Sequence, residues 1–391
     1  MESNKYSSMV STASLKALFE AEFGQSPRFF RSPARINLIG EHTDYNEGFV
    51  LPAGIDLYCN IAIAPSGSSE CTLVACDLEE RVSFDAHSDI KSEAFWANYI
   101  TGVRRAFRKR GIHLPGINAV IRSEVPVGAG LSSSAALESV FAFAFNELFS
   151  CGLSKIELTK IAQESENEFI GLQCGIMDMF ASIHAQENQA IKLDCRSLSF
   201  DYIPLALGQN KLLLFDTMVK HELASSEYNT RREECNAVVS FLQNLGQPVQ
   251  SLRDVDMTML SAIQSNINPV LFKRAKYVVE ENSRLNSFAE AVSRNDWHEA
   301  GSLLYQSHEG LKNEYEVSCT ELDVLVDTVR GMDGVWGARM MGGGFGGCTL
   351  NLVEESNVEA IVDQVNAGYL KSFGLKPKHY IAGTCNGASA F

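Results

Sequence analysis

Hydrophobic and polar positions follow two different rhythms along the chain. Short apolar runs bounded by glycine, proline or serine are typical of strands, whereas apolar residues at helical spacing are typical of amphipathic helices. In the first half, the strand pattern covers residues 56–64, 71–76, 81–84 and 117–123, with 65–69 as a hairpin-like connection. The helical pattern covers 12–23, 95–110, 135–149 and 154–169, and Ser154 and Glu157 have the spacing of a capping box. The first half therefore predicts a mixed or antiparallel sheet with helices packed against it.

The second half opens and closes with strand patterns and is helical between them. Strands are predicted at 189–195, 200–204 and 211–216, and amphipathic helical runs at 238–245, 271–291 and 298–312. Ser318 and Glu321 predict a second capping box, which would begin a helix that ends at Gly331. A strand at 348–354, a helix at 358–373 and a strand at 380–384 predict a βαβ-like end. With a boundary near Leu207, we expect two domains, residues 1–207 and 208–391.

Composition narrows the class of protein. A chain of 391 residues with 45% hydrophobic residues is too long for one ordinary core and fits two domains. Its net charge of −15 argues against a nucleic-acid-binding surface, and we expect no nucleic-acid partner. It carries neither a signal-peptide-like run nor a long apolar stretch of membrane-span type, so we expect a cytoplasmic protein with no membrane association. Ten scattered cysteines and eight dispersed histidines predict reduced thiols and no protein-held transition metal.

A Gly/Ser-rich segment from Pro126 to Glu138 runs directly into an alanine-rich helical pattern. Glycine lets several backbone N–H groups approach one anion, and a helix start adds unpaired N–H groups and a positive dipole, so the segment suits a phosphate. A serine hydroxyl there suits Mg²⁺ held on phosphates. The sequence contains no Gly-Lys pair, which argues against an ordinary P-loop. The alternative is a plain Gly/Ser turn before a serine-capped helix. The candidate nucleotide-binding residues are Gly128, Ala129, Gly130, Leu131, Ser132, Ser133 and Ser134.

Two further loops are rich in functional side chains or in glycine. Residues 41–46 hold Glu41, His42, Asp44, Tyr45 and Asn46, a density of hydrogen-bonding groups that suits sugar hydroxyls; a polar surface loop is the alternative. Residues 342–347 contain five glycines in six positions, which stabilise neither helix nor strand. Close approach of another group to this backbone is the functional interpretation, and a hairpin turn is the alternative.

The segment Pro126–Ala135 resembles the phosphate loop of the GHMP kinase superfamily, whose signature is Pro-X-X-X-Gly-Leu-Ser-Ser-Ser-Ala. The segment Arg35–Gly48, which reads Arg-Ile-Asn-Leu-Ile-Gly-Glu-His-Thr-Asp-Tyr-Asn-Glu-Gly, is similar to the signature of the galactokinase family. Two departures are Ala34, where the family usually has glycine, and Met179, where it commonly has glutamine; these leave the strictness of sugar choice open. The resemblance implies an α+β two-domain GHMP kinase fold. In it, an N-terminal mixed-sheet domain and a C-terminal ferredoxin-like domain flank the active site.

The same resemblance implies roles for individual residues. Further matches are Ser165–Phe169, Cys174–Phe180 and Ser226–Arg232. Asp178 would be the catalytic base and Arg35 would lie beside the C1 hydroxyl of the sugar. Ser134 and Glu166 would be the Mg²⁺ ligands, which suits a cation that keeps several waters. ATP would lie along the phosphate loop, with Gly343 and Gly344 of the glycine-rich loop against it. The implied sugar-binding residues are Arg35, Glu41, His42, Thr43, Asp44, Gly175, Asp178 and Tyr228.

The implied activity is phosphorylation of D-galactose by ATP to α-D-galactose 1-phosphate, with Mg²⁺ as cofactor. The expected partners are these small molecules, and no obligate protein partner is inferred. One alternative is a kinase of a related sugar, such as galacturonate, arabinose or N-acetylgalactosamine. Galacturonate would need a cation near its C6 carboxylate, whereas the loop presents Glu41 with His42. Another alternative is a non-catalytic sensor of galactose and ATP, although Ser134, Glu166 and Asp178 are all present.

Overall fold

The N-terminal sheet is built from six strands in the order β13-β1-β3-β6-β4-β5, in a computed structural model that describes residues 11–220 and 224–391. All neighbours are antiparallel except β4 and β6, so the predicted mixed sheet is confirmed. Residues 65–69 do not form the predicted hairpin, because β6 lies between β3 and β4 and pairs with both. The strands are β1 (Arg28–Asn37), β3 (Pro52–Pro65), β4 (Glu70–Ala75), β5 (Glu80–Asp85), β6 (Ile117–Ser123) and β13 (Ser389–Ala390).

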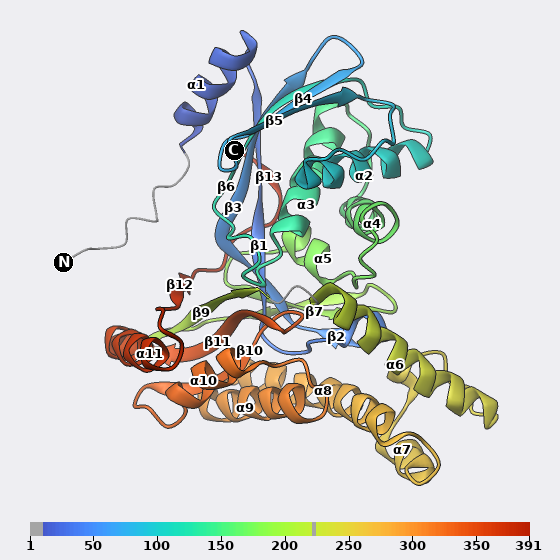
Figure 1. The fold of residues 1–391 in the computed structure, drawn as a ribbon, viewed down its shortest axis with the longest axis vertical. Helices are drawn as coiled ribbons and strands as arrows, with labels where there is room; N and C mark the ends of the chain where they lie inside the picture. The colour runs from blue at the N-terminus through green and yellow to red at the C-terminus, as the bar shows by residue number, and fades with distance from the viewer. Residues whose placement is uncertain (1–10, 221–223) are drawn as a thin grey trace.

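Four helices pack near one another beside this sheet, and α1 lies apart from them near its upper end (Figure 1). Leu15 and Phe19 of α1 bury against Ala62 and Val120 of the sheet. The central helix α3 follows the phosphate loop and contacts β1, β3, α2, α4 and α5, so its start is held rigidly. The helices are α1 (Thr12–Phe23), α2 (Phe95–Lys109), α3 (Ser133–Leu148), α4 (Lys155–Glu164) and α5 (Met177–His184), with a π-helical turn at Ser165–Ile170.

The helix starts test the two predicted capping boxes. At α4 the Ser154 hydroxyl accepts from the Glu157 N–H while the Glu157 carboxylate accepts from the Ser154 N–H, so this box is confirmed. At α10 the box is wrong. The helix begins one residue later than predicted, after Cys319, and the Ser318 hydroxyl donates to the Asp323 carboxylate instead.

A small antiparallel sheet, β2-β7-β8, lies between the two larger ones and consists of β2 (Phe49–Val50), β7 (Gln189–Asp194) and β8 (Phe200–Pro204). Phe180 on α5 packs against Ile191 and Leu193 of β7, in a core of its own. This packing connects α5, which carries Asp178, to β7, which pairs with β2 shortly after residues 41–46.

The C-terminal sheet has the order β10-β11-β9-β12 with antiparallel neighbours throughout. Helices separate β9 from β10 and β11 from β12, whereas the glycine-rich loop joins β10 directly to β11, so this is the strand order of a ferredoxin-like βαββαβ fold. The strands are β9 (Asn210–Lys220), β10 (Val335–Met340), β11 (Gly346–Glu354) and β12 (Lys378–Ala382). The helices are α6 (Ala224–Asn244), α7 (Met257–Ile263), α8 (Pro269–Ser293), α9 (Trp297–Asn313), α10 (Thr320–Val329) and α11 (Val358–Phe373).

The predicted boundary near Leu207 lies in the connection between β8 and β9. The last residues nevertheless return to the N-terminal sheet, where Ser389 and Ala390 pair with β1 (Figure 1). The split into 1–207 and 208–391 thus stays a prediction, and residues 1–10 of its first part lie outside the described ranges.

No helix in the described ranges combines the length and apolar character needed to cross a membrane.

Candidate active site

The phosphate loop joins β6 to α3 through a backbone that bends repeatedly. Gly128 and Gly130 have φ values of 82° and 75°, and Ser132, the N-cap of α3, has a φ of 60°. These left-handed conformations are accessible to glycine and strained for other residues. Val127, which is 67% exposed, and Gly128 lie at the surface a few residues ahead of a helix N-terminus. This geometry suits an anion.

Arg35 and Asp178 meet although 143 positions separate them in the chain. Arg35 lies near the end of β1 and Asp178 in the first turn of α5. The guanidinium donates from Nε to Oδ1 at 2.8 Å and from Nη2 to Oδ2 at 3.0 Å, a bidentate pair. Nη1 donates to the Gly130 carbonyl at 2.7 Å, and the Ser132 hydroxyl donates to Asp178 Oδ2. The pair is therefore attached to the phosphate loop.

The Arg35 side chain is 5% exposed and that of Asp178 is 26% exposed. Burial lowers the pKa of Arg35, but the Asp178 carboxylate, together with the charges of Glu41 and Asp44, opposes it, and the net pKa is raised. The buried guanidinium of Arg35 thus stays charged, while the Asp178 carboxylate paired with it remains partly exposed to solvent.

Ser134 and Glu166 face each other across the start of α3. The Ser134 hydroxyl donates to Glu166 Oε1 at 3.0 Å, and Cys174 Sγ lies 3.3 Å from Oε2. Glu166 sits in the π-helical turn after α4, which shifts its side chain out of the regular helical register. Burial raises the pKa of Glu166 to about 7, and the Asp178 charge adds to the shift. A hydroxyl and a carboxylate at one end of a phosphate loop are ligands that Mg²⁺ accepts.

Glu41 is buried between the sugar loop (residues 40–46) and the C-terminal sheet. Its Oε1 accepts from Arg339 Nη2 at 3.0 Å and from the Gly342 N–H at 2.9 Å. Arg339 is fully buried and also donates to the carbonyls of Asn37 and Leu38. Sequence reasoning missed Arg339, although an arginine in the apolar run before a glycine-rich loop was a signal that a buried carboxylate lies nearby.

The other residues of the sugar loop fall into two groups. Thr43 is fully buried and its hydroxyl contacts the carbonyls of Gly40 and Phe49, so it shapes the loop. His42 and Asp44 carry perturbed charges: burial lowers the pKa of His42 to about 3 and raises the pKa of Asp44 to about 7, with Asp178 adding to the second shift. A neutral polar ligand bound here would therefore meet an uncharged ring and a carboxylate whose charge is disfavoured by burial and by Asp178.

Gly175 and Tyr228 enclose the sugar loop. A Cβ on Gly175 would lie 1.9 Å from Asp44 Oδ2, so only glycine leaves room for that carboxylate. Tyr228 on α6 lies with its ring centroid 5.3 Å from those of His42 and Tyr45. Its ring also lies 3.4 Å from the position that a Cβ on Gly343 would occupy.

The glycine-rich loop lies directly against the phosphate loop. A Cβ on Gly347 would lie 3.3 Å from Ala129 backbone atoms, and one on Gly342 would lie 3.4 Å from the Gly130 carbonyl oxygen. Two glycine turns from different sheets thus touch backbone to backbone. A Cβ on Gly344 would lie 2.1 Å from the Val317 carbonyl oxygen, so this glycine is also needed for packing within the C-terminal half.

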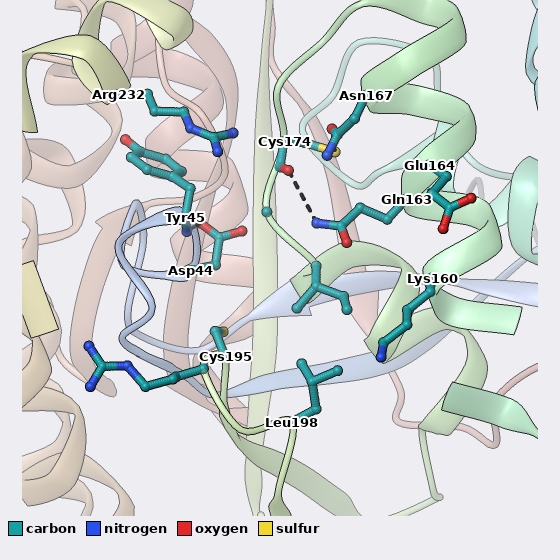
Figure 2. Close-up of a pocket in the computed structure, with 13 residues that line it drawn as sticks. Asp44, Tyr45, Lys160, Gln163, Glu164, Asn167, Cys174, Cys195, Leu198 and Arg232 are labelled. Atoms are coloured by element: carbon teal, nitrogen blue, oxygen red, sulfur yellow. Dashed lines mark hydrogen bonds between the residues drawn. The ribbon is translucent and has the colours of Figure 1, made fainter. Parts of the chain in front are cut away.

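A polar cavity of about 390 Å³ adjoins the site. Figure 2 shows Asp44 and Tyr45 on one side of it, Gln163 and Lys160 from α4 on the other, and Cys174 between them. Its lining reaches Ile176 but not Asp178. The cavity therefore lies behind the sugar loop rather than at the Arg35–Asp178 pair.

The structure brings the predicted residues together in one place between the two larger sheets. Arg35 and Ser132 both donate hydrogen bonds to Asp178, and Arg35 also donates to the Gly130 carbonyl. The charge of Asp178 contributes to the raised pKa of Asp44. In the described ranges no group of three or more His, Cys, Asp or Glu side chains forms a metal cage. All ten cysteines lie in these ranges and are free there, and the reduced state of the thiols stays a prediction.

This fold and this site define a GHMP kinase. Family models for the N-terminal and C-terminal GHMP kinase domains match residues 98–186 and 288–371, and a galactokinase galactose-binding signature matches residues 17–65. A galactokinase of Thermosipho africanus is 41% identical over 92% of this chain and 98% of its own length. One of Roseiflexus is 38% identical over 97% of both. The chain belongs to the galactokinase family, and it is an enzyme that uses ATP.

Solved structures agree. The Lactococcus lactis galactokinase complexed with galactose superposes with a TM-score of 0.93 at 33% identity, over 97% of this chain and 99% of that one. The Methanococcus jannaschii mevalonate kinase, at 18% identity over 92% of this chain and 99% of its own, has a TM-score of 0.68 and shares the fold. These matches confirm the predicted fold class.

Proposed function

We propose that the enzyme transfers the γ-phosphate of ATP to the C1 hydroxyl of D-galactose, with Asp178 as the base. The observation that supports this most is the bidentate Arg35–Asp178 pair bonded to the phosphate loop. A base for a kinase must sit within reach of both the acceptor hydroxyl and the terminal phosphate. Asp178 meets this need, because its carboxylate is partly exposed and touches Ser132 of that loop.

In the proposed step, the C1 hydroxyl gives its proton to Asp178 while its oxygen forms a bond to the γ-phosphorus. The bond from that phosphorus to the β–γ bridging oxygen breaks, and ADP leaves. Arg35 holds the carboxylate with two charged hydrogen bonds and places positive charge beside the developing alkoxide. The phosphate loop and the start of α3 would bind the triphosphate through backbone N–H groups.

Ser134 and Glu166 are the residues that would hold Mg²⁺. They fit the ion because they offer one hydroxyl and one carboxylate oxygen 3.0 Å apart, leaving other positions for phosphate and water. When bound, the ion supplies charge neutralisation on the phosphates.

On the sugar side, we assign Asp44, His42, Tyr228 and Glu41 to galactose hydroxyls. Asp44 supports this assignment because burial beside Asp178 raises its pKa to about 7, so hydroxyl donors would relieve it. Glu41 Oε1 already accepts hydrogen bonds from Arg339 and from the Gly342 N–H, so Oε2 is the oxygen better placed for a sugar hydroxyl. Gly175 contributes to the site because its missing side chain leaves space for the Asp44 carboxylate.

The test is ADP release measured with Mg-ATP and a panel of sugars: galactose, glucose, galacturonate, arabinose and N-acetylgalactosamine. We expect turnover with galactose and little with glucose. Another sugar turning over faster would overturn the substrate assignment, and galactose binding without ADP release would indicate a sensor. Asp178→Asn should lower kcat by about 10²–10⁴-fold with an unchanged melting temperature. Unchanged turnover in this variant would remove the base assignment.

The absence of a protein partner and the cytoplasmic location stay predictions from the sequence.

A further inference from the structure

A row of hydrogen-bonded side chains runs behind the sugar loop. It begins at Asn46, whose Nδ2 lies 3.6 Å from Cys235 Sγ, and continues from Cys235 Sγ to the Tyr315 hydroxyl at 3.2 Å. The Tyr315 hydroxyl lies 2.8 Å from that of Tyr45, which lies 2.7 Å from His42 Nδ1. We call these five residues the tyrosine relay. It joins the sugar loop to α6, which carries Cys235, and to the segment before α10, which carries Tyr315.

The relay is closed to solvent along most of its length. Tyr315 is fully buried, and Cys235, Asn46 and His42 are 1%, 3% and 4% exposed, while Tyr45 is half-buried. Buried polar groups need partners, so each hydrogen in the row must point at the next acceptor.

Asn46 fixes the direction in which these hydrogens point. Its Nδ2 donates to the His42 carbonyl at 2.9 Å, and a carbonyl can only accept, so the amide orientation is settled. The second amide hydrogen then points at Cys235 Sγ. With its sulfur accepting from Asn46, the thiol donates to Tyr315, Tyr315 donates to Tyr45, and Tyr45 donates to His42 Nδ1. The opposite direction would leave a buried thiol hydrogen with no acceptor in the row.

We propose that the tyrosine relay holds His42 as the tautomer with its hydrogen on Nε2, so that His42 donates a hydrogen bond to a sugar oxygen. Tyr45 and Tyr315 then act as positioning residues that set this polarity. The inference rests on the proposed function in one respect, since it takes His42 as a contact of the sugar.

The surroundings of His42 agree with this assignment. Its Nε2 is buried and has no hydrogen-bond partner of adequate geometry in the described ranges. Burial lowers the pKa of the ring to about 3, against a smaller opposing effect of the Gly343 backbone, so the ring carries a single hydrogen near neutral pH. The ring is also held between Tyr315 and Tyr228, with centroids 4.9 Å and 5.3 Å away. Nδ1 and Nε2 therefore cannot exchange places easily.

Substrate analogues can distinguish a hydrogen bond that His42 donates to the sugar from one that it accepts. Fluorine in place of a hydroxyl keeps a weak acceptor and loses the donor, whereas a deoxy sugar loses both. We expect one ring position at which the deoxyfluoro galactose exceeds the deoxy galactose in kcat/KM by about fivefold, the equivalent of a net hydrogen bond of about 1 kcal/mol. His42→Ala should bring this ratio to about one at that position alone. A ratio that His42→Ala leaves unchanged at every position would overturn the proposal.

Removal of one relay hydroxyl tests the positioning role. Tyr45→Phe should reduce the same ratio and raise the KM for galactose while kcat stays close to wild type. Tyr202→Phe is the matched control, since its half-buried hydroxyl donates to the His184 carbonyl at 2.7 Å, away from the relay. An equal effect of both variants on the ratio would show that Tyr45 has only a structural role.

A measurement without substrate separates the relay from the proposed function. In protein with ¹⁵N-labelled histidine, the chemical shifts should show His42 Nδ1 unprotonated and Nε2 protonated, and Tyr45→Phe should mix the two forms. A protonated Nδ1 in the wild-type protein would overturn the proposal even if galactose is the substrate. Conversely, the expected shifts with no galactose turnover would support the relay while the proposed function fails.

Discussion

The sugar loop and the phosphate loop both contribute to the proposed active site but are built in opposite ways. In the sugar loop, Glu41 accepts a hydrogen bond from Arg339, and the Gly40 N–H donates one to Glu281. His42 is connected to α6 through the tyrosine relay. The phosphate loop leaves Val127 and Gly128 exposed. Its conformation comes from positive φ values and from contact with the glycine-rich loop.

Because the two loops are held in different ways, they should tolerate different kinds of substitution. The sugar loop depends on specific side chains that belong to both halves of the chain, so changes there should affect stability and sugar binding together. The first part of the phosphate loop, Val127 to Gly130, depends on backbone shape, so substitutions of its glycines should act on nucleotide binding mainly through backbone strain.

Arg339→Met should have the largest effect on stability. It leaves the Glu41 carboxylate buried and removes the donor to the carbonyls of Asn37 and Leu38. Breaking one side of a buried ion pair costs about 3–5 kcal/mol of unfolding free energy. Chemical denaturation measures this cost. Arg122→Met is the control, since Arg122 is half exposed and 4.0 Å from Asp77, and it should change the value by less than about 0.5 kcal/mol. Equal costs in the two variants would contradict the role assigned to Arg339.

Gly175→Ala should act on sugar binding. The added Cβ would lie 1.9 Å from Asp44 Oδ2, so the carboxylate must move away from its place beside Asp178. Since an ångström of misplacement can cost up to about 100-fold, we expect the kcat/KM for galactose to fall roughly ten- to hundredfold while the KM for ATP changes little. In Gly368→Ala, by contrast, the new Cβ lies 3.7 Å from Thr328, and both kinetic constants should stay as in wild type. A rise confined to the KM for ATP would argue against the assignment of Asp44 to the sugar.

Galactose binding should weaken below neutral pH through Asp44. Burial raises the pKa of this carboxyl to about 7, with Asp178 and Glu41 adding to the shift and Arg35 opposing it. If the ionised form accepts sugar hydroxyls, the Kd for galactose rises about tenfold per pH unit below 7. Calorimetry with galactose alone, without nucleotide or metal, keeps any effect of Glu166 protonation on metal and nucleotide binding out of the comparison.

Asp44→Asn should bind galactose weakly and with a flat pH profile. The sign for stability is the reverse of that for binding. An acid whose pKa is raised in the folded state destabilises the protein increasingly as pH rises from about 4 to about 7, and Asp44→Asn removes this loss. If the variant were less stable than wild type at pH 8, the carboxyl would not be strained.

Gly130→Ala should have the smallest effect. Its φ of 75° is strained for alanine, but the nearest atom to a new Cβ is the Met341 carbonyl oxygen at 3.5 Å, so there is room. We expect a loss of about 1 kcal/mol in stability and a modest rise in the KM for ATP, with the KM for galactose unchanged. A larger effect on galactose than on ATP would remove the contrast between the two loops.

Much of this candidate site could be predicted from local sequence motifs. The phosphate loop lies before a helix, as the Gly/Ser pattern predicted, and Ser134 faces Glu166 as the resemblance implied. The ferredoxin-like order of the second sheet also followed from the resemblance rather than from the strand pattern.

Long-range placement could not be predicted in this way. The insertion of β6 between β3 and β4 depends on pairing across about 50 residues, and no local signal at 65–69 reveals it. Ser318 matched a capping pattern, but the helix begins one residue later, with Cys319 at the N-cap position, and the Ser318 hydroxyl donates to Asp323. Tyr315 joins Tyr45 from 270 positions away, which only the packed structure discloses.

The edge position of β13 beside β1 has a consequence for synthesis. During translation, β1 emerges among the first segments and keeps one side uncovered until residues 389–390 leave the ribosome. A nascent strand with open N–H and C=O groups can recruit chaperones or neighbouring chains. A bulky fusion placed directly after Phe391 should therefore lower the soluble yield more than the same fusion on a longer spacer.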